Sequence, residues 1–419
     1  MKDTVIQKLN LGSNVFLTGG AGVGKTTITN EVIKTYEAEA KKVAKLASTA
    51  MAATLIGGQT LHSFFDLGIC EDTEALKLQG KFEIPKKVKK LLAVLDLIVI
   101  DEISMVSAAL LEMVALRLKQ GGFRGVLLVV GDFLQLPPVS KGFVDVAFAF
   151  ESAVWSEFAF EPIELTHIYR TDDVAFIELL HHIRFGFVDE VVHNKLNGLI
   201  KPIGEDLSNT TFLYGKNISA SRHNKEQLEA IEGELFVKEA QVVKHKKSLK
   251  DHEIKRFFQD ARIEEELELK IGAPVLFSRN AWNYYNGERG VVVNIDATYV
   301  YVQKSDGKVV KLEQVAQHKT VWVEKTIAGE KQMVQEEVLS IYQYPIKLAF
   351  AITIHKSQGM SIESLVIDTN EIFAPSQFYV ALSRSSNPHQ LTLIAPKKQW
   401  WQLAYVNPKA LAFVKGLGC

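Results

Sequence analysis

Short apolar runs recur through the first 190 residues of the chain, without the polar–apolar alternation of a strand that faces water on one side. Strands that are buried on both faces of a parallel sheet have this pattern. Segments that predict helices separate the runs. The pattern therefore predicts a doubly wound α/β domain, and its predicted strands are Asn14–Thr18, Val43–Ala47, Leu97–Ile100 and Val126–Val130.

The middle of the chain departs from this pattern. Residues 64–92 are charged and contain glycine and proline, so they predict an insertion. The highly charged segment Leu249–Glu268 predicts a helix. Short strands between residues 291 and 323 predict a small antiparallel barrel of roughly fifty residues. The α/β pattern then returns, with core strands predicted at Leu365–Ile367 and Leu391–Ile394.

Composition narrows the class of protein only slightly. The chain has 419 residues, of which 47% are hydrophobic and 23% charged, and its net charge of −1 is not the bulk signature of a nucleic-acid binder. Local positive charge can still serve a nucleic acid, and basic clusters occur at Lys81–Lys90 and Lys244–Lys250. The two cysteines, Cys70 and Cys419, give no disulfide framework or metal cluster. With no membrane-length apolar run and no signal peptide, we expect a cytoplasmic location.

The stretch from Gly19 to Thr26, GGAGVGKT, fits the phosphate-binding loop pattern G-x-x-x-x-G-K-[ST] at every fixed position. A predicted strand precedes it and a predicted helix follows it. Glycines let the backbone curl around a phosphate, and the helix adds its positive N-terminal end. We expect Lys25 to reach the β- and γ-phosphates of a nucleotide and Thr26 to hold Mg²⁺ through its hydroxyl.

Polar residues at other strand ends add candidate chemistry. Asp101 and Glu102 end an apolar predicted strand, and ligands bind at the carboxyl ends of such strands. We expect Asp101 to face Mg²⁺ and Glu102 to orient the attacking water. Gln135, after the next strand, could sense the γ-phosphate or that water, or it could belong to a strand exit without a ligand. Arg170 and Arg384 could stabilise charge on a transferring phosphoryl group, or form surface ion pairs.

Several segments resemble, in this order, the motifs of the superfamily 1 helicases. They are GGAGVGKT (19–26), STAMAATLIGGQTLHSFF (48–65), VIDEISM (99–105), VGDFLQLPPV (130–139), LTHIYR (165–170), AITIHKSQGMS (351–361) and FYVALSRS (378–385). The combination resembles the RecD-like, Pif-one-type branch, superfamily 1B, whose members move 5′ to 3′ along single-stranded DNA. The resemblance implies an ATP- and Mg²⁺-dependent DNA helicase, with RNA–DNA hybrids and G-quadruplexes as further candidate substrates. It also implies a role in DNA repair, recombination or replication, with telomere maintenance among the roles of the family.

The resemblance also implies a domain organisation. Two RecA-like domains would enclose ATP between them, the first at residues 1–63 and 93–188 and the second at 189–293 and 343–419. Residues 64–92 would form the wedge that meets the duplex fork, and residues 294–342 an inserted SH3-like barrel.

Site residues follow from the same resemblance. The catalytic set would be Lys25, Thr26, Asp101, Glu102, Gln135, Arg170 and Arg384, with Thr26 and Asp101 at the metal. The nucleotide would contact Gly19, Gly20, Ala21, Gly22, Val23, Gly24, Lys25, Thr26, Thr27, Gln358 and Gly359. The DNA would pass Thr49, Thr60, His62, Phe64, Thr353, His355, Lys356 and Ser357. A base could stack on Phe64, although the same residue could be an ordinary core phenylalanine.

Three functions remain open from the sequence. The first is a 5′→3′ helicase that acts as a monomer on junctions between single-stranded and duplex DNA. The second is a single-strand translocase that strips proteins from DNA and barely unwinds it. The third is a phosphate-loop protein used as a scaffold, which would not need the whole catalytic set.

Overall fold

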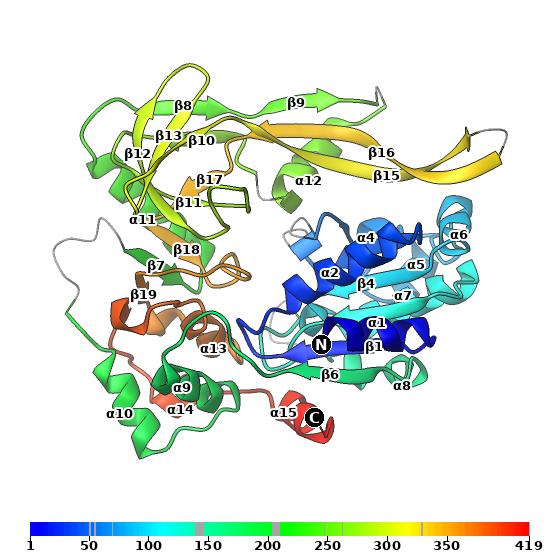
Figure 1. The fold of residues 1–419 in the computed structure, drawn as a ribbon, viewed down its shortest axis with the longest axis horizontal. Helices are drawn as coiled ribbons and strands as arrows, with labels where there is room; N and C mark the ends of the chain where they lie inside the picture. The colour runs from blue at the N-terminus through cyan, green and yellow to red at the C-terminus, as the bar shows by residue number, and fades with distance from the viewer. Residues whose placement is uncertain are drawn as a thin grey trace.

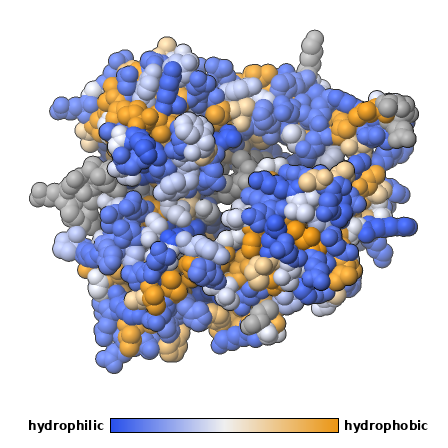
Figure 2. Space-filling model, in the orientation of Figure 1, coloured by the Kyte–Doolittle hydropathy of each residue, from blue (hydrophilic) through white to orange (hydrophobic). Residues whose placement is uncertain are grey.

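The structure is a computed structural model that describes residues 1–49, 52–53, 56–68, 70–138, 146–202, 210–246, 248–261, 263–327 and 330–418. Val139, Cys419, position 247 of the second basic cluster and positions 50, 51, 54 and 55 of the 48–65 segment lie outside the described residues. Figure 1 shows two α/β units and a β-rich region from which a long hairpin extends over the N-terminal unit. Apolar residues on the face in Figure 2 form scattered patches between hydrophilic ones. No described helix is long and apolar enough to cross a membrane.

The first α/β unit is built on six parallel strands in the order β3–β2–β4–β5–β1–β6. Their bounds are β1 (Val15–Gly19), β2 (Val43–Ala47), β3 (Gln59–Thr60), β4 (Leu97–Asp101), β5 (Val126–Val130) and β6 (Glu161–Leu165). The four strands that the sequence predicts lie at the centre of this sheet. The edge strand β6 was not predicted, because polar residues alternate with Ile163 and Leu165 and only the latter two are buried.

Helices cover both faces of this sheet, as a doubly wound domain requires. They are α1 (Lys2–Asn10), α2 (Lys25–Ala38), α4 (Leu61–Phe64), α7 (Ala108–Gly121), α8 (Ala153–Glu157), η1 (Ile103–Met105) and η2 (Ala149–Glu151). Hydrophobic residues of α1 and α2 pack in one core and those of α7 in another.

The predicted insertion folds into two helices, α5 (Thr73–Leu78) and α6 (Lys86–Leu92). A fully buried arginine of α7, Arg117, holds it in place. The guanidinium donates to the carbonyl oxygens of Phe65, Phe82 and Lys81 at 3.2, 2.7 and 2.5 Å. The insertion is therefore fixed to the first unit by a charged group that satisfies its own hydrogen bonds.

The second α/β unit has four parallel strands in the order β18–β7–β19–β20. The strands are β7 (Thr211–Tyr214), β18 (Ala351–Thr353), β19 (Leu365–Ile367) and β20 (Leu391–Leu393). Its helices are α9 (Val174–Arg184), α10 (Glu190–Gly198), α11 (Asn217–Ala230), α13 (Gln377–Leu382), α14 (Trp400–Leu403), η3 (Thr369–Glu371) and η4 (Pro388–Gln390). The last helix, α15 (Pro408–Gly416), returns to the first unit, where Phe413 stacks on Phe150 at 4.2 Å. Together the two units confirm the predicted pair of RecA-like domains.

The β-rich region consists mainly of antiparallel strands. Five of them form a sheet in the order β14–β13–β12–β11–β17, and β15, β16 and β9 form another. The bounds are β8 (Phe236–Glu239), β9 (Gln241–Lys244), β10 (Glu266–Leu269), β11 (Pro274–Phe277), β12 (Arg289–Ile295), β13 (Val300–Lys304), β14 (Val309–Leu312), β15 (Val315–Ile327), β16 (Glu330–Gln343) and β17 (Ile346–Leu348). Residues 294–342 are thus divided between two sheets, and their description as an SH3-like barrel stays a prediction.

Two local predictions in this region are wrong. The predicted helix Leu249–Glu268 ends early: α12 covers Asp251–Ala261, and β10 follows. The alternation of Glu and Leu in β10 buries Leu267 and Leu269 on one face, which is a strand pattern. Residues 320–323 are not a short barrel strand but part of β15, which pairs with β16 in the long hairpin. This hairpin contacts the first unit, because Nε2 of Gln59 donates to the Thr320 carbonyl at 2.6 Å.

Candidate active site

The phosphate-binding loop joins β1 to α2 at the carboxyl edge of the first sheet. Gly22 and Gly24 have φ angles of +78° and +86°, which favour glycine. A Cβ on Gly19 would lie 2.3 Å from the Leu165 carbonyl oxygen, so this position also requires glycine. The Lys25 ammonium donates to the carbonyl oxygens of Gly19 and Gly20 at 2.6 and 2.7 Å. The loop thus holds its lysine beside its own backbone, at the start of α2.

Two carboxylates follow β4 directly, at the same edge. Asp101 Oδ1 accepts a hydrogen bond from the Glu102 amide at 2.8 Å, and Glu102 takes the left-handed conformation with φ +52°. Burial and the nearby Glu102 charge raise the pKa of Asp101 to about 7. Burial also raises the pKa of Glu102, while Lys25 and Arg384 oppose this shift. The site therefore concentrates negative charge that a cation would offset.

These residues fit a magnesium ion. Mg²⁺ prefers oxygen ligands and binds proteins through one or two carboxylates together with phosphates of the substrate. The Asp101 carboxylate lies close enough to Lys25 for their charges to interact, and Thr26 is the next residue of the loop. Asp101 and the Thr26 hydroxyl are the groups that would hold the ion.

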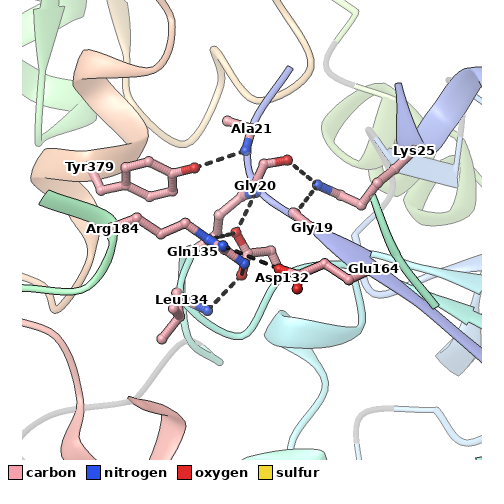
Figure 3. A network of polar contacts seen from close by, with 10 residues as sticks. All are labelled: Gly19, Gly20, Ala21, Lys25, Asp132, Leu134, Gln135, Glu164, Arg184 and Tyr379. Carbon is pink, nitrogen blue, oxygen red and sulfur yellow. Dashed lines mark hydrogen bonds and ion pairs between the residues drawn. The ribbon is translucent and has the colours of Figure 1, made fainter. Parts of the chain in front are cut away.

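A buried ion pair lies next to the loop (Figure 3). Asp132 follows β5, and its two carboxylate oxygens accept hydrogen bonds of 3.0 Å from Nε and Nη2 of Arg184. The side-chain Nε2 of Gln135 donates to the same carboxylate at 3.3 Å, and Nη1 of Arg184 lies 3.5 Å from Oε1 of Glu164. Arg184 holds the pKa of Asp132 below its usual range even though burial acts in the opposite direction. Gln135 is thus positioned by Asp132, beside the loop drawn in Figure 3.

Asp132 and Arg184 were not among the site residues predicted from the sequence. Asp132 carries a usable signal, because it follows β5 in the same way as Asp101 ends β4. Arg184 has no such signal, since it lies at the end of α9, 52 residues away along the chain. Tyr379 of α13 was also missed, and its hydroxyl accepts a hydrogen bond from the Ala21 amide of the loop at 2.8 Å.

Both candidate arginines lie between the two α/β units. Arg384 is 2% exposed and donates to the Val380 carbonyl at 2.9 Å, to the Ser357 carbonyl at 3.3 Å and to the Ser383 hydroxyl at 2.8 Å. Burial lowers the pKa of Arg384 to about 10, and the Glu102 charge opposes this shift. The structure therefore brings an arginine of the second unit close to a carboxylate of the first, which is not the arrangement of a surface ion pair.

Arg170 lies beside the loop and beside Arg384. Its Cβ is 2.9 Å from the position that a Cβ on Gly22 would take. It donates to the Ser361 hydroxyl at 2.9 Å and to the Ser383 carbonyl. Burial and the Arg384 charge lower the pKa of Arg170 to about 9. The charges of Arg170 and Arg384 act on one another beside the loop, so an anion bound here would be favoured.

Gln358 and Gly359 are the other residues that we expect to contact the nucleotide. Gln358 is 8% exposed, and its side-chain NH₂ group has no hydrogen-bond partner among the described residues. A buried amide without a partner is costly and is available to a ligand. Gly359 has φ +77°. Two residues earlier, the Ser357 carbonyl accepts a hydrogen bond from Arg384. The contact of Gln358 and Gly359 with a nucleotide stays a prediction.

Two grooves contain residues expected at the DNA. His355 and Lys356 line a groove of about 540 Å³ together with Lys347, and Thr60 and His62 line one of about 350 Å³ beneath α12 and β15. A small cavity lies between them: it shares Ala261 with the second groove, and Ile263, Glu264 and Lys347 with the first. The three hollows therefore adjoin one another.

Four other candidate DNA residues are less accessible. Thr353 lines the groove of His355 and Lys356 but is only 2% exposed. Ser357 is 0% exposed, and its hydroxyl donates to the Ile354 carbonyl at 2.8 Å, so it supports the loop that carries His355 and Lys356. Thr49 accepts a hydrogen bond from the Ala52 amide at 3.3 Å. Phe64 is 5% exposed, and its ring packs 4.9 Å from that of Phe65. Base stacking on Phe64 is not supported, because its ring belongs to the core of the first unit.

Two RecA-like sheets, a phosphate-binding loop on one and an arginine from the other define a two-domain nucleotide hydrolase of the helicase type. The family model described as PIF1-like helicase matches residues 2–194. The chain is 42% identical to the ATP-dependent DNA helicase Pif1 of Campylobacter jejuni, over 94% of this chain and 91% of that protein. It is 35% identical to that of Bdellovibrio bacteriovorus, over 98% and 90%. The chain belongs to the Pif1-like helicases.

Solved structures of Bacteroides Pif1 extend the comparison to the arrangement of the domains. The complex with ADP-AlF4 has a TM-score of 0.84 and the unliganded protein 0.83, both at 28% identity over 100% of this chain and 96% of that one. The protein bound to ssDNA has a TM-score of 0.65 at 29% identity, over 99% and 95%. Because sequence and coverage hardly differ, the present arrangement is closer to those of the unliganded protein and the ADP-AlF4 complex than to that with ssDNA.

Proposed function

We propose that this chain is an ATP-dependent DNA helicase that moves 5′ to 3′ along single-stranded DNA and opens duplex DNA ahead of it. The placement of Arg384 is the observation that carries this proposal. It comes from the second α/β unit, and its charge interacts with Glu102 on the first. A site shared in this way can couple hydrolysis to motion between the two units.

The chemistry assigns a role to each charged group. Lys25 would leave the carbonyl oxygens of Gly19 and Gly20 and bind the β- and γ-phosphates. Arg384 and Arg170 would stabilise the negative charge that develops on the γ-phosphoryl group. Glu102, with its raised pKa, would orient the attacking water and accept its proton. Mg²⁺ held by Thr26 and Asp101 would neutralise charge on the phosphates.

Motion would follow from this shared contact. Lys25 and Arg384 can both bind ATP only while the two units are close, and hydrolysis removes the phosphate that joins them. The Thr60–His62 groove lies on the first unit and the His355–Lys356 groove on the second. If each groove holds the DNA backbone in turn, a cycle of closing and opening becomes a step along the strand. Binding should weaken steeply with salt, because such contacts are mainly electrostatic.

ATP-dependent unwinding of a duplex with one single-stranded tail tests the proposal. Opening of only the 5′-tailed duplex would support both the activity and the direction. Opening of only the 3′-tailed duplex would overturn the direction. DNA-stimulated ATP hydrolysis without unwinding of either duplex would favour the translocase, and hydrolysis that DNA does not stimulate would favour the scaffold.

Other parts of the proposal rest on the relatives. We propose a monomer in the bacterial cytoplasm, since the two relatives named above are bacterial. A related structure describes unwinding of forked duplex DNA by two coordinating Pif1 helicases, so sedimentation with and without a fork should test the monomer. RNA–DNA hybrids and G-quadruplexes are further proposed substrates, with repair, recombination or replication as the setting. Each substrate can replace the duplex in the same unwinding assay.

A further inference from the structure

The loop between β11 and β12 displays an unusually exposed tryptophan. Trp282 is 95% exposed, more than any other large apolar side chain in the part of the chain that the structure describes. Tyr285 in the same loop is 53% exposed, and Arg279 is exposed as well. Tryptophan is highly buried on average, so this degree of exposure needs a reason.

The loop around Trp282 is well braced. The ring of Tyr284 stacks on that of Phe277 at 4.3 Å with an interplanar angle of 16°. The Ala281 amide donates to the Tyr284 carbonyl at 2.8 Å, and the Asn286 amide donates to Asn280 Oδ1 at 2.7 Å. Contacts on both sides therefore fix the backbone that carries Trp282, while its indole ring stays free to meet a partner.

The same loop borders the proposed DNA path. A Cβ on Gly287, which has φ +89°, would lie 2.9 Å from Met360 Cβ, so the loop presses against the 351–361 segment. Ser278 and Asn286 line the small cavity between the two grooves, and this cavity shares Lys347 with the groove of His355 and Lys356. A strand that lies in that groove would pass close to the loop.

We propose that Trp282 is a stacking platform for a base of single-stranded DNA, with Arg279 as a backbone or stacking partner. An aromatic ring with a neighbouring arginine is the combination that binds unpaired nucleic acid without sequence preference. The nearby groove adds Lys347, His355 and Lys356, which lie beside Glu264 and Glu265. A protein partner would need a larger continuous apolar surface than one tryptophan and one tyrosine. The inference rests on the proposed function, because it places single-stranded DNA in this groove.

Binding of two oligonucleotides of equal length tests the inference, one of thymidines and one of abasic sites with the same phosphates. Fluorescence anisotropy gives the affinity of the wild type and of Trp282→Ala, Trp282→Phe and Trp282→Leu. On the thymidine strand, Trp282→Ala should weaken binding about 5- to 100-fold, Trp282→Leu by a similar factor, and Trp282→Phe much less, since only phenylalanine keeps a π-face. On the abasic strand, the three variants and the wild type should bind alike.

Trp401→Ala is the matched control, since Trp401 is 63% exposed on α14 and lies outside the grooves. It should bind both strands as the wild type does. If the wild type binds thymidines and Trp282→Ala binds them equally well, the stacking site is overturned while the helicase proposal stands. An equal loss on both strands would also overturn it, because the effect would then not involve bases. If the wild type binds neither strand, the proposed function fails and the stacking site with it.

Discussion

The two RecA-like units contribute to the active site in different ways. On the first sheet, the site residues follow the strands themselves: the loop leaves β1, Asp101 ends β4 and Asp132 follows β5. On the second sheet, Arg384 and Tyr379 lie on or just after the helix α13, and Arg384 reaches the site from between the units. The first unit offers a fixed edge for a nucleotide, and the second offers side chains whose position depends on how the units meet.

The two arrangements indicate different roles for the two units. A fixed edge is suited to ground-state binding, because its groups keep their geometry without the partner unit. Side chains that arrive with a second body are suited to the transition state, since they act only when the units are close. Substitutions in the first unit should therefore remove the chemistry, while those in the second should separate chemistry from binding.

Lys25→Ala should have the largest effect. It removes the cation that we propose binds the β- and γ-phosphates, so ATP hydrolysis should fall by more than ~10³-fold. Binding of single-stranded DNA should stay near the wild-type value, because the grooves do not include Lys25. A phosphate-release assay and anisotropy measure the two effects. Lys34→Ala, an exposed position on the same helix, is the control, and normal turnover in Lys25→Ala would refute the assignment of the loop.

Arg384→Ala should come next and should separate rate from affinity. An arginine that stabilises the transferring phosphoryl group contributes about 10³-fold to the rate, whereas ATP binding should weaken by less than ~10-fold. Single-turnover hydrolysis and binding of a fluorescent ATP analogue measure both. Arg222→Ala, an exposed position on α11, should change neither. Equal losses in rate and affinity would make Arg384 a ground-state ligand and would weaken the contrast between the units.

Glu102→Gln should slow hydrolysis by at least ~10²-fold while ATP still binds. The amide keeps the size of the side chain but cannot accept the proton of the attacking water. Removing one of two buried carboxylates also relieves repulsion, so the pKa of Asp101 should fall below its value of about 7. Single-turnover hydrolysis is the measurement, with the exposed Glu31→Gln as control. An unchanged rate would reject Glu102 as the base.

The same contrast explains what the sequence could predict. The loop of eight residues, the carboxylates after β4 and the four central strands are local patterns, and each could be assigned from neighbouring residues alone. Edge strand β6 could not, because Pro162 and its polar neighbours do not form an apolar run. Asp132 could have been noted because it closely follows β5, but its role depends on Arg184, which only the fold brings to 3.0 Å.

Exposure was the other property that the sequence did not provide. Phe64 and Phe65 are adjacent and chemically equal, and only packing places both in the core. Trp282, in contrast, is exposed. No sequence pattern distinguishes an exposed tryptophan from a buried one. Both cases depend on contacts between distant segments, which a local pattern does not contain.

Tyr379→Phe should have the smallest effect and is the most direct test of the link between the units. It removes the hydroxyl that accepts the Ala21 amide at 2.8 Å and leaves the ring in place. One hydrogen bond contributes about 1 kcal/mol, or a factor of about five. If this contact helps to hold α13 against the loop during hydrolysis, turnover should fall about fivefold while the affinity for ATP changes by less than twofold. Tyr405→Phe, a half-exposed tyrosine of the same unit, should leave both unchanged. Normal turnover in Tyr379→Phe would mean that the hydrogen bond between Tyr379 and Ala21 opens before hydrolysis. Of Tyr379 and Arg384, only Arg384 would then act in the chemical step.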